Sequence, residues 1–495
     1  MDFLLSSLVL IPLAGSLIAA ALPRKWPALI RGTGLFFAVA VALLSILLYA
    51  NFDAQAPTMQ FVERYAWMPS MGLYFHLGVD GISLFLILLT TGLTPLVLLA
   101  GWPAAKERIK EYTCAVLALS AVLVGTFAAL DLLLFYVFCE GVLLPAFFLV
   151  GMWGRRRRIY AALQMALYSS AAGLPFLVAV IYLGDYHRQV DGQFHFGLAE
   201  LQQLTLPPDV QLWGLLAFFA YFALRLALFP LHTWFPAVQA AAPLPITVVL
   251  AGVALKVGAY GLLRFCAPLF PEAFYIYSAH LAALAVFGAV YGALLAMVQD
   301  DLQKMVAHAT ASQMGLVALG IATLNLQGVQ GSVMLLVAHG ISSAALLLLA
   351  GVFYRRFQTQ ELAQCGGLSK SMPVFAALFL IASLAFVGLP GSGGFVGGLA
   401  ILAGSFARFG PHALAAMLAA ALIALRFAVL FQRAMWGEEK GMGIDMRWRE
   451  WAPILSLLLI SLWLGLFPAA LLQRTEGAVE QLLVRAGTTV EVEGN

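Results

Sequence analysis

The chain has 495 residues, of which 62% are hydrophobic and only 10% are charged, and its mean hydropathy is +0.94. About a quarter of the residues of a soluble domain are charged, so this composition excludes a soluble domain and predicts a protein that crosses the membrane several times. The formal net charge is only +3, and no basic patch interleaved with aromatic residues points to nucleic acid as a partner.

The apolar residues form long continuous runs, which favours transmembrane helices over the alternating strands of an outer-membrane barrel. We predict an all-α polytopic membrane protein with about fourteen transmembrane segments, numbered here in chain order. Their expected ranges are 3–22, 30–50, 81–101, 112–130, 131–153, 162–184, 211–235, 245–268, 277–298, 304–324, 329–353, 373–402, 411–436 and 452–472. The first basic residues follow the first apolar run instead of preceding it, so we interpret this run as a retained helix and not as a signal peptide.

Lys and Arg residues concentrate in the loops that follow the odd-numbered segments. These residues are Arg24, Lys25, Arg31, Lys106, Arg108, Lys110, Arg155, Arg156, Arg157, Arg158, Lys304, Arg355, Arg356, Arg433, Lys440, Arg447 and Arg449. The loops after the even-numbered segments carry fewer, such as Arg64, Arg188 and Arg264. Short loops rich in Lys and Arg stay in the cytoplasm, so we expect the odd-side loops there and both termini on the opposite side of the membrane.

Two segments carry residues that interrupt a helix. Residues 225–245 of segment seven read "RLALFPLHTWFPAVQAAAPLP", and residues 386–398 of segment twelve read "FVGLPGSGGFVGG". Proline inside a helix frees carbonyl groups that lipid cannot satisfy, so such breaks are expected where protein or water surrounds them. The breaks lie five segments apart, which inverts the second unit relative to the first and is the pattern of a transporter's ion path. Two ordinary proline kinks are the alternative.

Glu140 and Lys256 are ionisable residues inside the apolar segments five and eight. A charge at the centre of the bilayer costs about 3 kcal/mol on insertion scales, so such residues usually serve a function. Burial disfavours the charged form of both side chains, and a neighbouring charge can therefore switch them. This is the property that a proton relay requires. The alternative is a static ion pair that helps the helices to associate.

Three histidines and one lysine extend the set of candidate relay residues. Lys304 and His308 are four residues apart, so they share one face at the start of segment ten. His339 lies deeper, in segment eleven, and His232 lies in the break of segment seven. An imidazole titrates near neutral pH and both donates and accepts hydrogen bonds, which suits a water-linked relay. A hydrogen-bonded core position or a helix cap is the alternative for the histidines, and a snorkelling interface position is the alternative for Lys304.

Arg225 and Arg426 are arginines at membrane depth. A guanidinium stays protonated, so each can bias the charge of a neighbour but cannot pass on a proton by losing it. Pairing with a carboxylate is the expected arrangement for both. The four cysteines have no paired spacing, and the sequence contains no metal, haem, iron–sulfur or nucleotide motif, so we expect no cofactor and no metal in this chain.

Six stretches together resemble the antiporter-like subunits of respiratory NADH–quinone oxidoreductase (complex I), specifically subunit M, called chain 4 in mitochondria. They are "HLGVDGISLFLILLTTGLTPLVLLAGW" (76–102), "FYVFCEGVLLPAFFLVGMWG" (135–154), "FALRLALFPLHTWFP" (222–236), "LAGVALKVGAYGLLRF" (250–265), "DLQKMVAHATASQMGLV" (301–317) and "LPGSGGFVGG" (389–398). The resemblance runs through nearly the whole chain with the motifs in order, and it places the chain in the Mrp-antiporter-like superfamily.

The resemblance implies three N-terminal helices in residues 1–110, a first five-helix repeat in 111–268, an inverted repeat in 269–440, and a last helix with a tail in 441–495. It implies a proton-translocating, non-redox subunit of the bacterial inner membrane, with both termini in the periplasm. NADH, FMN, iron–sulfur clusters and quinone are expected in partner subunits of the membrane complex, whose quinone reduction drives the proton transfer.

By position, Glu140 corresponds to the family's segment-five glutamate, Lys256 to its segment-eight lysine and His339 to its segment-eleven histidine. Four positions depart from the family pattern: Arg225 replaces a lysine, His308 a tyrosine, Gln313 a histidine, and Gly398 the segment-twelve glutamate. Three alternatives with the same fold stay open: an Mrp-type cation/proton antiporter subunit, a membrane-arm subunit of a related hydrogenase or carbon-uptake complex, and a weakly pumping structural copy.

Overall fold

The computed structural model describes residues 3–103, 105–436, 438 and 443–487. Among them, twelve helices are long and apolar enough to cross a membrane, by length and composition. Two further segments are each built from two shorter helices, α8–α9 and α17–α18. These twelve and the two segments built from paired helices make the fourteen that the sequence predicts, and the all-α membrane fold is confirmed. Lys440, one of the basic loop residues, lies outside the described residues.

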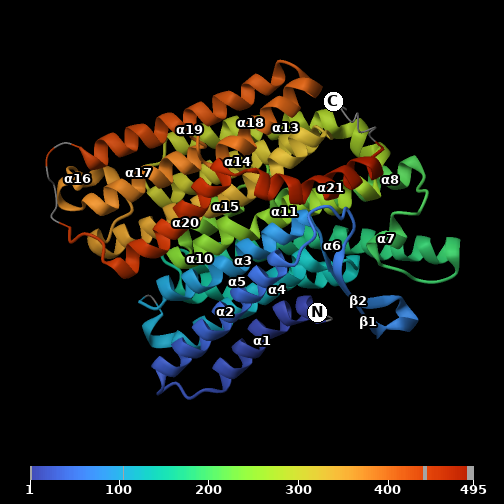
Figure 1. Cartoon of the computed structure of the whole chain (residues 1–495), viewed down its shortest axis with the longest axis horizontal. Helices are drawn as coiled ribbons and strands as arrows, with labels where there is room; N and C mark the ends of the chain where they lie inside the picture. Colours follow the sequence, from blue (N-terminus) through green and yellow to red (C-terminus); the bar gives the residue numbers. More distant parts are fainter. Residues whose placement is uncertain (1–2, 104, 437, 439–442, 488–495) are drawn as a thin grey trace.

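The elements of the first half follow one another with short connections (Figure 1). They are α1 (Leu4–Ala21), α2 (Pro27–Ala50), β1 (Gln60–Met68), η1 (Pro69–Met71), β2 (Leu73–Val79), α3 (Gly81–Gly101), η2 (Lys106–Arg108), α4 (Ile109–Ala128), α5 (Leu132–Trp153), α6 (Arg158–Asp191), α7 (Leu198–Leu201), α8 (Pro208–Arg225), α9 (Trp234–Ala241), α10 (Leu244–Val249), η3 (Leu250–Ala254), α11 (Lys256–Gly261), η4 (Leu262–Cys266) and α12 (Ala267–Leu269).

The second half continues in the same way. Its elements are α13 (Pro271–Met297), α14 (Leu302–Ala322), α15 (Leu326–Phe357), η5 (Leu362–Gln364), α16 (Leu368–Ser371), α17 (Pro373–Val387), α18 (Gly393–Phe409), α19 (His412–Met435), α20 (Trp448–Leu466) and α21 (Ala469–Arg485). The helices at the centre of the bundle are more buried than those at its rim. The most apolar stretch of α15 is completely buried, whereas only 28% of the corresponding stretch of α2 and of α20 is buried.

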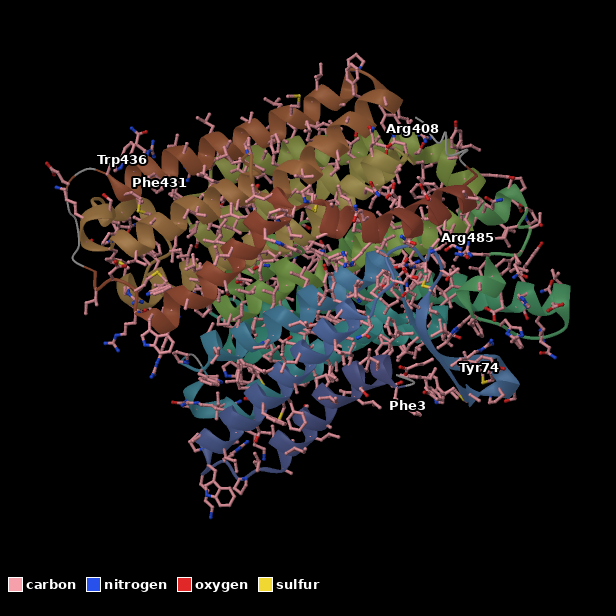
Figure 2. All side chains as sticks on the ribbon, viewed as in Figure 1. Phe3, Tyr74, Arg408, Phe431, Trp436 and Arg485 are labelled. Carbon is pink, nitrogen blue, oxygen red and sulfur yellow. The ribbon has the colours of Figure 1, made fainter. Side chains whose placement is uncertain are left out.

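The two ends of the bundle differ in the connections that they carry. In Figure 1 the turn between α1 and α2 and the short helix α16 lie at one end, and the β1–β2 hairpin and α7 lie at the other. The start of α1 and the end of α21 share this second end, which we call the termini end. Figure 2 shows Phe431 and Trp436 at the first end, and Phe3, Tyr74 and Arg485 toward the termini end. We call the first end the arginine-rich end, because the segments alternate in direction and the basic loops therefore meet there.

Both predicted helix breaks are present. α8 ends at Arg225 and α9 begins at Trp234, and the Trp234 Nε1 donates a hydrogen bond of 3.0 Å to the Leu224 carbonyl oxygen. The indole thereby satisfies one of the carbonyl groups that the end of α8 leaves free. In segment twelve, α17 ends against Gly388, whose φ of +86° favours glycine. Ser392 then caps α18.

Segment eight is interrupted in a different way that the sequence analysis does not anticipate. Two π-helical turns, η3 and η4, lie on either side of α11, which begins at Lys256. π-Helical turns are rare and frequently occur at functional sites.

Two regions outside the fourteen predicted segments contain regular structure. The loop after α2 forms the antiparallel hairpin β1–β2, and the expected C-terminal tail contains α21, a helix of 17 residues. α21 packs against α3 and α15. Both regions mix polar with apolar residues, so they carry no hydropathy signal of a membrane-spanning segment.

Candidate functional site

Glu140 and Arg225 form an ion pair between α5 and α8. The Arg225 Nη2 lies 2.9 Å from the Glu140 Oε1, and it also donates to the Cys139 carbonyl oxygen at 3.1 Å. The Glu140 side chain is 22% exposed and the Arg225 side chain 10%. Each charge therefore has a partner, as a charge removed from water requires. The expected pairing of Arg225 with a carboxylate is confirmed.

Tyr221 completes this cluster, and the sequence analysis missed it. Its hydroxyl donates to the Glu140 Oε1 at 2.7 Å and accepts from the Arg225 Nη2 at 2.9 Å. Tyr221 and Arg225 are four residues apart on α8, which places both on one helix face. The Phe176 ring stacks on the Tyr221 ring with centroids 4.6 Å apart. The available signal was the four-residue spacing of an aromatic hydroxyl and an arginine inside an apolar helix.

Lys256 and His339 form a second cluster, between α11 and α15. The Lys256 Nζ lies 2.9 Å from the His339 Nδ1 and donates to the Ala251 carbonyl oxygen at 2.7 Å. Lys256 is 0% exposed and His339 2%. The lysine is therefore bound to an imidazole and a carbonyl oxygen and not to a carboxylate, unlike the static ion pair considered as its alternative.

The π-helical turn η3 explains the lysine's second bond. The Leu255 N–H bonds to the Leu250 carbonyl oxygen, five residues back, at 3.2 Å. In an α-helix this N–H would bond to Ala251. The wider turn withdraws that donor from the Ala251 carbonyl, which accepts from the Lys256 Nζ instead. Local backbone geometry and the buried ammonium group thus support each other.

The remaining candidates lie along α14 and in the segment-seven break. Lys304 is exposed near the start of α14, and His308 is half-buried one turn further on. His308 interacts electrostatically with His232 and Lys304. His232 is 7% exposed and stacks on the Phe229 ring with centroids 5.7 Å apart. The buried Nδ1 atoms of both histidines have no hydrogen-bond partner among the described protein atoms. His232 also interacts with the Pro230 backbone in the break, so the capping alternative stays open for this residue.

Three further positions bear on the path that a proton could take. Arg426 on α19 donates to the Gln299 carbonyl oxygen and lies 3.6 Å from the Asp300 Oδ1, which confirms its expected carboxylate partner. Gln313 is buried on α14. Gly398 lies on α18, and a Cβ built there would meet no heavy atom within 4 Å. A longer side chain therefore has room at this position.

The site thus consists of two polar clusters inside the bundle and not of scattered lipid-facing charges. α8 and α11 join them, because Gly258, two residues after Lys256, lies directly against the backbone of α8. A Cβ at Gly258 would be 2.4 Å from the Leu226 nitrogen, next to Arg225.

Comparisons with known proteins agree with this architecture. The family model described as NADH:quinone oxidoreductase/Mrp antiporter, TM, matches residues 129–424. Subunit M of NADH-quinone oxidoreductase from Rhodobacter capsulatus is 40% identical over 484 residues, 95% of this chain and 94% of that protein. NADH-ubiquinone oxidoreductase chain 4 of Marchantia polymorpha is 36% identical over 489 residues, 97% of each.

Solved structures extend the comparison to the fold. A chain of respiratory complex I from Thermus thermophilus has a TM-score of 0.87 and 32% identity, covering 98% of this chain and 99% of that one. A chain of the Mrp complex from Dietzia sp. has a TM-score of 0.84 at 21% identity, covering 97% and 98%, and shows the shared fold alone. The matched family model and these relatives of nearly equal length show that the chain belongs to the NADH:quinone oxidoreductase/Mrp antiporter family of membrane subunits.

Proposed function

We propose that the chain is the antiporter-like subunit M of a proton-translocating NADH–quinone oxidoreductase. The observation that carries this proposal is the buried Lys256–His339 pair, 2.9 Å apart, beside the Glu140–Arg225 ion pair at an interrupted helix. Relatives named subunit M and chain 4 match nearly the whole chain. In this role the subunit carries no redox group of its own.

Lys256 is the central proton carrier in this proposal. While Arg225 is paired with Glu140, its positive charge is balanced and the ammonium form of Lys256 is tolerated. When the pair separates, the uncompensated guanidinium repels the ammonium group across the α8–α11 contact, and Lys256 gives up a proton. His339 can accept and donate a proton at Lys256 because its Nδ1 already contacts the amine and its Nε2 has no other described protein partner. His308, His232 and Lys304 extend the relay toward the arginine-rich end.

The driving energy comes from partner subunits of the membrane arm. NADH, FMN, iron–sulfur clusters and quinone belong to those partners, and quinone reduction there displaces the charge pairs of this chain. We place the arginine-rich end in the cytoplasm of a bacterial cell and the termini end in the periplasm, because short basic loops are retained in the cytoplasm.

The test is the Lys256→Ala variant of the whole complex, purified and reconstituted in proteoliposomes. We expect proton uptake during NADH oxidation to fall strongly, because the variant removes the central carrier, while electron transfer to an artificial acceptor persists in the partner subunits. Lys370→Ala, at an exposed lysine of α16, is the matched control and should leave proton uptake unchanged. Full proton uptake by Lys256→Ala would remove Lys256 from the relay.

Two outcomes favour the other candidate functions. Sodium-dependent proton exchange, without co-purifying subunits that contain flavin and iron–sulfur clusters, would indicate an Mrp-type antiporter. The open position of Gly398 on α18, where the family resemblance implies a glutamate, favours the weakly pumping structural copy. That copy predicts normal assembly and an unchanged proton yield in Lys256→Ala.

A further inference from the structure

Asp80, Tyr260 and Arg264 form a third buried polar cluster, at the opposite end of segment eight from η3. The Arg264 Nη2 forms an ion pair with the Asp80 Oδ2, and the Arg264 Nε donates to the Tyr260 hydroxyl at 3.3 Å. Asp80 is 2% exposed and Arg264 8%. This cluster is separate from the Glu140–Arg225 and Lys256–His339 clusters. The sequence analysis places Arg264 in a connecting loop, which is wrong, because Arg264 is buried in η4 within segment eight.

The new cluster contains the same kinds of residue as the Glu140 cluster, but one hydrogen bond differs. Tyr221 donates to the Glu140 carboxylate, whereas Tyr260 donates to the Phe127 carbonyl oxygen at 3.0 Å. In each, a tyrosine lies four residues before an arginine, "YFALR" at 221–225 and "YGLLR" at 260–264. In each, the guanidinium bonds to the tyrosine hydroxyl and pairs with a carboxylate of another element. The guanidinium carbon lies 5.1 Å from the ring centroid of Tyr221 in one cluster and 5.3 Å from that of Tyr260 in the other. Lys256 lies in the sequence between these two matched clusters.

The cluster points from Lys256 toward the termini end along one helix face. Lys256, Tyr260 and Arg264 follow one another at four-residue steps, so they lie on the same side of segment eight. All three are buried, and the π-helical turn η4 contains Arg264. Because segment eight ends at Leu269, shortly after Arg264, the cluster lies near the termini end of the bundle.

The two carboxylate oxygens of Asp80 have different partners. Its Oδ1 caps α3 by accepting from the N–H groups of Ile82 at 3.1 Å and Ser83 at 3.0 Å. Its Oδ2 contacts Arg264. The helix cap therefore holds the carboxyl group in place whether or not Arg264 stays on the second oxygen.

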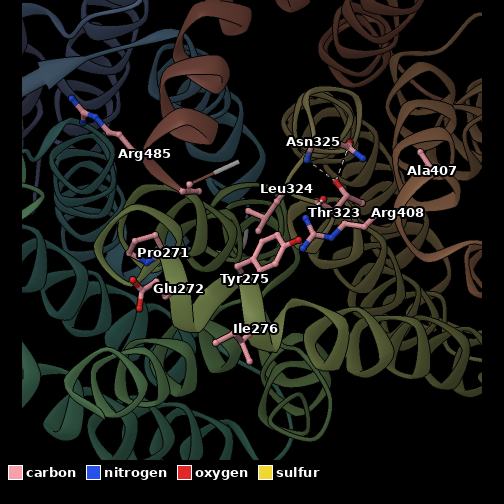
Figure 3. A pocket seen from close by; sticks show the side chains of 12 residues that line it. Pro271, Glu272, Tyr275, Ile276, Thr323, Leu324, Asn325, Ala407, Arg408 and Arg485 are labelled. Atoms are coloured by element: carbon pink, nitrogen blue, oxygen red, sulfur yellow. Dashed lines mark hydrogen bonds between the residues drawn. The ribbon is translucent and has the colours of Figure 1, made fainter. Parts of the chain in front are cut away.

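A cavity of about 810 Å³ opens at the termini end, and Arg485, the last residue of α21, lines it. Figure 3 shows Glu272, Tyr275 and Arg408 around it, with Arg485 at its edge and pointing away from them. Arg485 and Arg264 carry like charges and repel each other. α21 separates the cluster from the outside, because a Cβ at Gly81 would lie 1.8 Å from the Arg474 carbonyl oxygen of that helix. The cluster is thus covered by α21, and the end of the same helix reaches the cavity.

We propose that Asp80, Tyr260 and Arg264 form the outlet of the proton path, in place of an acidic residue in segment twelve. The Tyr260 hydroxyl, which donates to the Phe127 carbonyl oxygen at 3.0 Å in this structure, first turns toward the Asp80 Oδ2. It then takes one proton from the Lys256 ammonium, through bridging water, while it passes its own hydroxyl proton to the Asp80 Oδ2. Arg264 leaves this oxygen during the transfer. Lys256 and Asp80 are then both neutral and Tyr260 is unchanged. Asp80 finally releases the proton to water at the termini end and pairs with Arg264 again. This inference rests on the proposed function.

The first test removes only a hydroxyl group. Tyr260→Phe keeps the aromatic packing of Tyr260 against Phe127 and Phe135, and Tyr112→Phe is the matched control. Tyr112 is also fully buried. Its hydroxyl donates to the Val97 carbonyl oxygen at 3.1 Å, as the Tyr260 hydroxyl donates to that of Phe127 at 3.0 Å. In proteoliposomes of the whole complex, we expect Tyr260→Phe to lower the number of protons moved per NADH at least twofold, and Tyr112→Phe to leave it unchanged. An unchanged proton yield in Tyr260→Phe contradicts the proposal.

The second test is whether a glutamate introduced at position 398 restores the proton yield that the loss of the Asp80 carboxylate lowers. Asp80→Asn should lower the proton yield, and the double variant Asp80→Asn/Gly398→Glu should restore it, because Gly398 has room for the side chain. Asp80→Asn/Gly398→Gln, which lacks the acid, should not. A purely structural role of Asp80 predicts no rescue by a glutamate on α18. If the complex with Asp80→Asn does not assemble, the proton yields of Asp80→Glu, which keeps a carboxyl group, and of Tyr260→Phe test the proposal instead.

The two proposals fail in different ways. If Lys256→Ala abolishes proton uptake while Tyr260→Phe and Asp80→Asn retain the full yield, only the outlet is wrong. If Lys256→Ala retains full proton uptake, the relay itself is wrong and the proposed function fails with it.

Discussion

At the scale of single residues, the geometry of Arg225 separates it from a simple positive charge. Its Nη2 contacts three acceptors, the Glu140 Oε1, the Cys139 carbonyl oxygen and the Tyr221 hydroxyl. A planar guanidinium holds such a set of partners in a fixed arrangement, whereas an ammonium on a flexible chain does not. The hypothesis that this pair controls Lys256 therefore depends on the guanidinium geometry as well as on the charge.

Replacement of Arg225 by lysine tests this dependence. Arg225→Lys keeps the charge but loses at least one hydrogen bond to a charged group, worth about 1.5–3 kcal/mol. We expect coupled proton uptake to fall roughly tenfold, since about 1.4 kcal/mol corresponds to a factor of ten. Arg158→Lys, at an exposed arginine that bonds to the Met152 carbonyl oxygen at 3.0 Å, should have no effect. Unchanged proton uptake in Arg225→Lys would separate the ion pair from the function of Lys256.

The sequence predicts some members of the site and not others for a physical reason. Glu140, Lys256 and His339 stand out because a titratable side chain in an apolar run is costly and rare. Tyr221, Tyr260 and Asp80 do not stand out, since tyrosine is common in apolar helices and Asp80 lies just before the start of its segment. Their roles depend on contacts between segments, such as the ion pair of Asp80 with Arg264, 184 residues away.

At the scale of elements, the contact between α8 and α11 depends on the absence of a side chain. A Cβ at Gly258 would lie 2.4 Å from the Leu226 nitrogen and 2.5 Å from the Phe222 carbonyl oxygen. Both are backbone atoms and cannot rotate away. This approach brings the interrupted segment seven against the segment that carries Lys256.

A methyl group at this position should separate the two helices. We expect Gly258→Ala to destabilise the folded subunit by about 1–3 kcal/mol, the usual cost of overpacking, and to lower coupled proton uptake. Gly92→Ala on α3 is the matched control, because a Cβ there meets nothing within 4 Å. The thermal unfolding of the purified complex measures the difference. Equal stability of the two variants would show that α8 and α11 do not depend on this close contact.

The sequence predicts the interrupted helices but not the small elements around them. Proline in segment seven and the glycine-rich stretch of segment twelve break a helix by local rules, and both breaks are confirmed. The π-helical turns η3 and η4 have no local signature, because they depend on how segment eight packs against its neighbours. The β1–β2 hairpin and α21 lie outside the apolar runs that identify spanning helices.

At the scale of the whole molecule, the length of α6 makes the orientation of the chain in the membrane testable. Its 34 residues run from Arg158 to Asp191, which is about 51 Å at 1.5 Å per residue and exceeds a hydrocarbon core of about 30 Å. Exposed residues therefore lie at both of its ends, among them Arg157 beside its start and Asp191 at its finish. The two ends lie on opposite sides of any membrane that the helix crosses.

Single cysteines at these ends test the proposed orientation. In intact cells, a membrane-impermeant maleimide should label Asp191→Cys and leave Arg157→Cys unlabelled, because the basic loops remain in the cytoplasm. Inverted membrane vesicles should give the reverse pattern. The parent chain, in which Cys139, Cys266 and Cys365 are buried, provides the background. Labelling of Arg157→Cys in intact cells would reverse the orientation proposed here.

The overall architecture is the part of the structure that the sequence predicts best. Hydropathy alone yields the number of segments, because every spanning helix must be apolar along its length. The division into repeats at residues 110, 268 and 440 stays a prediction. Which charged residues meet could not be predicted, because the pairing of segments depends on side-chain packing that a single sequence does not display.

α15 has a consequence for how a change at one site reaches another. Segments seven, eight and twelve are all interrupted, but α15 is one continuous helix of 32 residues, about 48 Å long at 1.5 Å per residue. It carries His339 near its middle and packs against α10, α14, α18 and α21. An unbroken, close-packed helix shifts as a stiff rod more readily than it bends. An axial displacement of His339 therefore moves the contacts of α15 with α10 in the first half of the subunit and with α14 and α18 in the second half together. In this way α15 couples the movements of the two halves.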